Sequence, residues 1–104
     1  MAKYDDQKPP LGLIPPECLE DIAVVFGFGA EKYGVNNWRD DQHENSWIRT
    51  YYSIKRHLNK WHSGEDIDPE SGMSHLAHAT TQLMILMTAQ SEHPEVDDRY
   101  RKNA

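Results

Sequence analysis

The sequence predicts an all-α fold, and three observations lead to this prediction. Apolar residues recur at helical spacings of three and four in three separate stretches. Proline or glycine stands at the ends of these stretches. No stretch alternates apolar and polar residues as a strand does. We therefore expect one domain over residues 1–104, with an extended arm at 1–14, a core of three main helices at 15–92 and a frayed tail at 93–104.

The first helix is expected to begin where the arm ends and to stop before Gly34. Pro15 and Pro16 are excluded from a helix interior but suit its first turn. A glycine commonly ends a helix because it adopts positive φ without steric cost. The predicted apolar face of this helix consists of Leu19, Ile22, Ala23, Phe26, Ala30 and Tyr33.

The second helix is expected to begin after a polar loop over residues 34–46. Asn45 or Ser46 offers a side-chain oxygen that caps the first turn. Ser63 and Gly64 are expected to end the helix. Its predicted core stripe, at spacings of four and three, consists of Trp47, Tyr51, Ile54, Leu58 and Trp61.

The third helix is expected to start near Met73 or Ser74, because Pro69 and Gly72 exclude a regular helix through the preceding loop. Other apolar residues lie beside its core face, so its apolar surface extends around more than one side. A small monomer does not easily cover that surface, and we expect a homo-oligomer, an oligomeric helical bundle built through the first and third helices. The predicted core face consists of Leu76, Ala79, Thr80, Leu83, Leu86 and Met87.

Composition narrows the class of protein. The net charge of −6 and the pI near 5.4 argue against direct binding of nucleic acid or of an anionic membrane. A single cysteine, Cys18, excludes an internal disulfide and fits a reducing compartment. No apolar run approaches the roughly 20 residues that span a bilayer, and the first residues lack the apolar stretch of a signal peptide. We expect a soluble protein of the cytoplasm.

An acidic loop between the second and third helices carries the most chemical information. Carboxylates this close repel one another unless a cation or hydrogen-bond donors lie between them. Oxygen ligands suit Mg²⁺, with Mn²⁺ or another divalent metal as the alternative. A solvated turn that favours the N-terminus of the following helix is the competing interpretation. The predicted metal ligands are Glu65, Asp66, Asp68 and Glu70.

Histidines flank this loop on both sides. His75 and His78 lie three residues apart, on one side of the third helix, and Gln82 continues the same line. His57 lies at the edge of the second helix's core stripe. Because the loop joins these two helices, we expect His57, His75 and His78 to meet the carboxylates at one end of the hairpin. These three histidines are the predicted catalytic residues; packing at a helix end is the alternative for each.

A second polar set lies near the end of the first helix. A lysine meets phosphate, an aromatic ring stacks on a base and an amide reads a base edge, which together suit a nucleotide. An ordinary core position for the aromatic residues remains the alternative. The predicted substrate-binding residues are Lys32, Tyr33, Asn36, Asn37, Trp38 and, from the second helix, Arg56.

Six motifs resemble those of a known family. They are KP (8–9), LIPP (13–16), FGAEKYG (28–34), NW (37–38), RHLNKW (56–61) and GEDIDPESGMSHLAHA (64–79). Together they resemble the N-terminal domain of the phage-encoded dATP/dGTP diphosphohydrolases over roughly residues 3–90. The resemblance implies a phage protein of the host cytoplasm that converts purine deoxynucleoside triphosphates to monophosphate and pyrophosphate. The EExxE and ExxD metal motifs of the more distant MazG-like all-α pyrophosphohydrolases are absent, and His75-x-x-His78 stands in the corresponding helix.

These observations leave three functional hypotheses. The first is metal-assisted hydrolysis at the α-phosphorus, with a histidine taking the water proton and with Lys32 and Arg56 stabilising the departing pyrophosphate. The second is a non-catalytic phage protein that binds and sequesters nucleotides or cyclic nucleotides. The third is an interaction module in which the acid and histidine cluster only locks the hairpin.

Overall fold

The computed structural model of the chain describes residues 8–40 and 46–101. Over these two ranges it is helical, and an isolated bridge between Ile67 and Ser74 is the β contact they contain. None of the described helices is long and apolar enough to cross a bilayer. The all-α prediction is therefore confirmed. The elements are η2 (Leu11–Leu13), α1 (Pro16–Tyr33), α2 (Asn37–Asp40), α3 (Trp47–His62), α4 (His75–Glu92) and η3 (Pro94–Val96).

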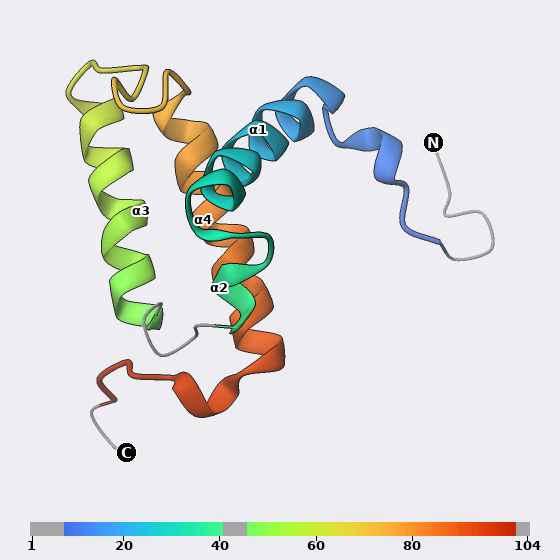
Figure 1. Cartoon of the computed structure of the whole chain (residues 1–104), viewed down its shortest axis with the longest axis vertical. Helices are drawn as coiled ribbons and strands as arrows, with labels where there is room; N and C mark the ends of the chain where they lie inside the picture. The colour runs from blue at the N-terminus through green and yellow to red at the C-terminus, as the bar shows by residue number, and fades with distance from the viewer. Residues whose placement is uncertain (1–7, 41–45, 102–104) are drawn as a thin grey trace.

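The helices α3 and α4 form an antiparallel hairpin, which is the centre of the fold (Figure 1). Each begins at a serine cap. Ser46 Oγ, a predicted cap, accepts from the backbone N–H of Arg49 at 3.2 Å, and Ser74 Oγ, at the predicted start of α4, accepts from that of Leu76 at 3.0 Å. The other predicted cap, Asn45, lies outside the described residues. The predicted end of α3 at Ser63 is also confirmed.

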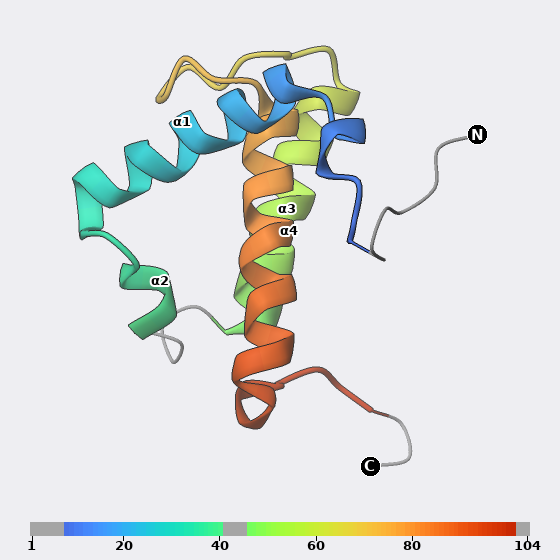
Figure 2. The ribbon, with the colours of Figure 1, turned by 90° about the vertical axis from the view of Figure 1, so that its right-hand side faces the viewer.

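The helix α1 packs on α4 and leaves the hairpin at an angle, so α1 and α2 stand to one side of it (Figure 2). The predicted limits of α1 are confirmed, with Pro16 in its first turn and Gly34 at its C-terminal cap with φ of 101°. A residue with a side chain would be strained at that positive φ. The sharp exit at Gly34 turns the chain back toward α4.

Three irregular segments contain more structure than predicted. The expected extended arm includes the single turn η2, and the expected loop includes the short helix α2. The tail is not wholly frayed, because η3 follows α4 and Asp98 Oδ1 accepts from the backbone N–H of Ile48 at 3.1 Å. That hydrogen bond ties the tail to the first turn of α3. The remaining arm and tail predictions, for residues 1–7 and 102–104, fall outside the described residues.

The core confirms part of the predicted stripe on α3. Trp47 and Ile54 are 5% and 4% exposed and Leu58 is half-buried, whereas Tyr51 and Trp61 are about half exposed. On α1 the prediction was largely wrong, since Val25 is its buried residue. The crossing helix contacts its neighbour over a short length, so most of its predicted face stays open.

The predicted core face of α4 was wrong for Leu76, Leu83 and Met87, which are 43%, 46% and 69% exposed. The side of α4 that faces inward shares the buried Ala79 with the predicted face but otherwise differs from it. The buried residues there are His75, Ala77, His78, Ala79, Thr81 and Ala89. Hydrogen bonds from the acidic loop draw the two histidines inward, and the small alanines allow close helix packing. The most apolar stripe of α4 is consequently left on the surface.

Candidate functional site

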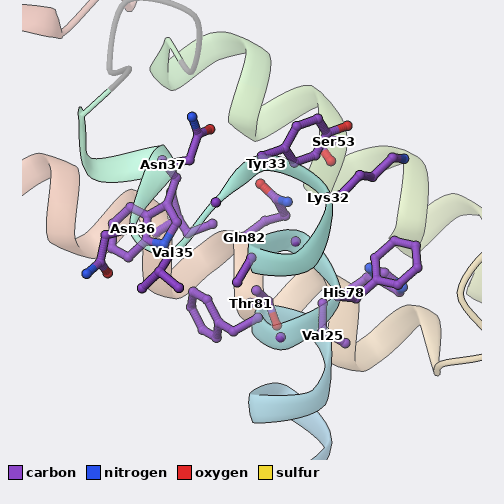
Figure 3. A pocket seen from close by; sticks show the side chains of 18 of the residues that line it. Val25, Lys32, Tyr33, Val35, Asn36, Asn37, Ser53, His78, Thr81 and Gln82 are labelled. Carbon is purple, nitrogen blue, oxygen red and sulfur yellow. The ribbon is translucent and has the colours of Figure 1, made fainter.

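A cavity of about 680 Å³ lies between the end of α1, the start of α2 and the inner sides of α3 and α4. Figure 3 shows its side chains, with Lys32 and Tyr33 reaching from α1 and with Thr81, Gln82 and His78 coming from α4. The structure brings ten of the predicted site residues together on this cavity. They are Lys32, Tyr33, Asn36, Asn37, Trp38, Arg56, His57, Asp68, Glu70 and His78.

The wall opposite the hairpin depends on the turn between α1 and α2. Gly34 and Asn36 both have positive φ, of 101° and 60°, and together they reverse the chain. Asparagine tolerates this conformation better than most residues. The Trp38 ring then packs at 6.1 Å from the ring of Phe26, centroid to centroid, which fixes α2 against α1.

His57, His75 and His78 meet at one end of the hairpin, as predicted, and two of them line the cavity. The Nδ1 atoms of His57 and His75 lie 2.9 Å apart. The rings of His57 and His78 stack in parallel, with centroids separated by 4.6 Å. His75 is only 2% exposed and lies behind the other two, so it does not line the cavity itself. Its Nε2 contacts Glu65 Oε2 at 2.7 Å.

The acidic loop is folded by its own hydrogen bonds. Asp68 N–H donates to the Met73 carbonyl at 2.8 Å, across a turn in which Gly72 has a φ of 73°. The Ser71 hydroxyl donates to Asp68 Oδ2 at 3.0 Å and accepts from the Met73 N–H at 3.1 Å. His78 Nε2 lies 2.6 Å from the same hydroxyl oxygen. Asp68 and His78 are thereby held side by side at the cavity.

The four predicted metal ligands do not converge. Glu65 faces His75, Asp68 faces Ser71, and Glu70 pairs with Lys32 at 2.9 Å. Asp66 is exposed and does not line the cavity. Over residues 8–40 and 46–101, no group of three or more histidine, cysteine, aspartate or glutamate side chains is arranged to hold a metal ion. These carboxylates stay apart because Glu65, Asp68 and Glu70 each contact a different side chain.

The charge states of the cavity residues follow from their surroundings. Burial lowers the pKa of His57, and the neighbouring His78 and His75 lower it further. Burial also lowers the pKa of His78. Burial alone would raise the pKa of Asp68, but hydrogen bonds from the Ser71 side chain and nearby backbone N–H groups outweigh it and lower that pKa. Near neutral pH the cavity thus presents neutral imidazoles beside an ionised carboxylate.

These pKa shifts predict how stability depends on pH. In the unfolded chain His57 and His78 bind protons as the pH falls through 6.5, their ordinary pKa. In the folded chain their pKa values are lower, so they bind protons only at a lower pH. The free energy of unfolding should therefore decrease as the pH drops below about 6.5. Urea denaturation between pH 8 and pH 5 measures this slope. His57→Gln should flatten it, whereas His62→Gln, at an exposed position on the same helix, should leave it unchanged.

Sequence reasoning assigned no role to three further polar residues of the cavity, which are Ser53, Thr81 and Gln82. Ser53 lies one helical turn before His57, and Gln82 lies one turn after His78. Their spacing of four from a predicted site residue was the available signal. A spacing of four indicates that the two residues lie on the same side of their helix. The sequence does not show that this side faces a cavity, because the cavity is formed by the packing of α1.

The chain was compared with known proteins. It matches the family described as "dATP/dGTP diphosphohydrolase, N-terminal" over residues 1–99. It is also 37% identical, over 97 residues, to a protein of Salmonella phage PMBT28 named "dATP/dGTP diphosphohydrolase". That alignment covers 93% of this chain and 32% of the relative, so the chain spans about a third of the relative's length. No solved structure matches the chain significantly.

Proposed function

The chain belongs to the N-terminal family of dATP/dGTP diphosphohydrolases, and from this premise we propose that it hydrolyses dATP and dGTP to monophosphate and pyrophosphate. One observation carries the proposal: cations, aromatic rings, amides and imidazoles surround a single cavity of about 680 Å³. Pockets for small ligands commonly measure about 300–1,000 Å³, a range that includes this cavity.

The cavity offers a complementary group for each part of a deoxynucleoside triphosphate. Lys32 and Arg56 lie on two different walls and suit the phosphate oxygens. Lys32 pairs with Glu70, but the Lys32 side chain is about half exposed and that of Glu70 is mostly exposed, so the pair is weak and exchanges readily for a phosphate. The Tyr33 ring, 64% exposed, suits stacking on the purine. Trp38 extends the aromatic wall, and Asn36 or Asn37 would read the base edge.

The proposed reaction is an attack of water on the α-phosphorus. A new bond forms between the water oxygen and that phosphorus, and the bond from it to the bridging oxygen breaks, which releases pyrophosphate. His57 takes the water proton, since its lowered pKa keeps it neutral near pH 7. Lys32 and Arg56 stabilise the charge that develops on the departing pyrophosphate.

We propose that Asp68 and Glu70 would hold Mg²⁺ together with the phosphates of the substrate, with Mn²⁺ or another divalent metal as a substitute. Mg²⁺ is commonly held by one or two carboxylates together with substrate phosphates. Asp68 and Glu70 line the cavity and fit that mode, whereas Glu65 and Asp66 lie outside it. The ion would neutralise part of the phosphate charge.

The direct test is to incubate the purified chain with dATP or dGTP in the presence of Mg²⁺, Mn²⁺ or EDTA. Products are separated by chromatography. We expect monophosphate and pyrophosphate in equal amounts, formed only with a divalent metal. Intact triphosphate under all conditions would contradict the hydrolase proposal.

The second candidate is a protein that binds nucleotides or cyclic nucleotides without hydrolysis. It is favoured by the engagement of Glu65, Asp68 and Glu70 with protein partners, because those contacts use carboxylate oxygens that a metal site would need. Calorimetry with each nucleotide in EDTA distinguishes the two. Tight binding in EDTA, combined with no hydrolysis in Mg²⁺, would favour the binding protein.

We further propose that a second copy of the chain covers the exposed stripe of α4. Residues 75–91 contain no lysine, arginine, aspartate or glutamate, although the chain as a whole carries a net charge of −6. Two such uncharged faces meet without the repulsion expected elsewhere on the surface.

Changing both Leu83 and Met87 to aspartate should convert a dimer or larger oligomer to a monomer in light scattering after size exclusion. Tyr100→Asp, at an exposed apolar position on the tail, is the control. A wild-type protein that is already monomeric would contradict this proposal.

A further inference from the structure

We propose that Glu65 and His75 are positioning residues that hold the proton of His57 on Nδ1 and leave its Nε2 unprotonated at the cavity. This inference rests on the proposed function, because it explains why His57 is the base. It assigns roles to two residues that lie outside the cavity lining.

The first step is the contact between Glu65 and His75. An ionised carboxylate only accepts hydrogen bonds, so the 2.7 Å contact places a proton on His75 Nε2. His75 is 2% exposed, and its backbone N–H donates to the Asp66 carbonyl at 2.9 Å. The backbone of His75 is therefore held in place by Asp66, and its ring is held by Glu65. A neutral His75 then has Nδ1 as its acceptor.

The second step is the contact between the two Nδ1 atoms. At 2.9 Å a single proton must lie between them, because two protons would clash and two lone pairs would repel. With Nδ1 of neutral His75 as acceptor, His57 is the donor. Neutral His57 consequently carries no proton on Nε2. Among residues 8–40 and 46–101, no hydrogen-bond partner contacts that Nε2 atom, and His57 lines the cavity.

The third step separates His57 from His78. The single proton of the Ser71 hydroxyl goes to Asp68, so the 2.6 Å contact requires His78 to donate from Nε2. His78 therefore donates its Nε2 proton to the Ser71 hydroxyl of the loop and does not offer a free Nε2 lone pair to the cavity. Its ring, parallel to that of His57 at 4.6 Å, restricts the rotation of His57. The geometry selects His57 as the base, whereas sequence reasoning left all three histidines equivalent.

The tautomer of His57 can be measured directly. Long-range ¹H–¹⁵N correlation spectra of the uniformly ¹⁵N-labelled full chain distinguish Nδ1–H from Nε2–H, and His57→Gln identifies the signals of His57. At about pH 8 an ordinary histidine is neutral. We expect Nδ1–H for wild-type His57. A proton on Nε2 of His57 in the wild type would overturn the inference, since His75 would then be the donor.

Two substitutions at Glu65 test the positioning role. Glu65→Gln keeps a side-chain oxygen that accepts from His75 Nε2 and should retain the Nδ1–H tautomer. Glu65→Leu removes the acceptor and should shift His57 toward Nε2–H, with kcat lowered about 10- to 100-fold and KM little changed, the scale found for partners that orient metal-ligating histidines. An unchanged tautomer in a folded Glu65→Leu variant would also overturn the inference. Because the spectra do not require turnover, a wild type that shows the Nδ1–H tautomer but no hydrolysis would contradict the proposed function alone.

Discussion

Replacing His57 with glutamine is expected to lower the rate of dATP and dGTP hydrolysis by about 10²- to 10⁴-fold, the usual contribution of a general base. Glutamine is similar in size and polar, but it takes no proton from water. Substrate binding should change much less than kcat, because the phosphate and base contacts come from other walls of the cavity. Initial rates measured over a range of triphosphate concentrations separate the two effects.

The control for His57→Gln is His62→Gln. His62 lies on the same helix but is exposed and does not line the cavity, so its loss should leave kcat unchanged. Far-ultraviolet circular dichroism confirms that both variants retain the helices. If folded His57→Gln kept wild-type activity, His57 would not be the base. If the two variants lost activity equally, the effect would come from stability and not from the chemistry.

The helices were predictable because their signals are local. Pro16, Gly34, Ser46 and Ser74 act within one turn of their own position, so their effect is readable in the sequence. The inward face of α4 was not predictable in the same way. Periodicity indicated the most apolar side, but the hydrogen bonds of His75 and His78 with the acidic loop decide which side faces α3.

The residues that line the cavity were more predictable than their arrangement around it. Sequence spacing placed Lys32 and Tyr33 in one set and His57 and His78 in another. The crossing of α1 over α4 brings both sets to one cavity, and that crossing has no local signature in the sequence. The same limit applies to the carboxylates, since spacing shows their proximity along the chain but not the direction of each side chain.

The difference between Asp68 and Asp66 gives the second large expected effect. Asp68→Asn should lower the hydrolysis rate by about 10²-fold or more near neutral pH and raise the Mg²⁺ concentration needed for half-maximal rate, because a charged ligand of the proposed ion is lost. The amide oxygen of asparagine still accepts from the Ser71 hydroxyl, so the loop should stay folded. A Mg²⁺ titration at saturating dGTP measures both changes.

The matched control is Asp66→Asn in the same loop. The Asp66 side chain is exposed and does not line the cavity, and its backbone carbonyl, which accepts from the His75 N–H, is kept in this variant. We therefore expect nearly wild-type activity from it. Loss of activity in Asp66→Asn with full activity in Asp68→Asn would reverse the assignment and place the metal contact on the outer side of the loop. Equal loss in both would instead favour the predicted cluster of four carboxylates, which would then have to assemble when the nucleotide binds.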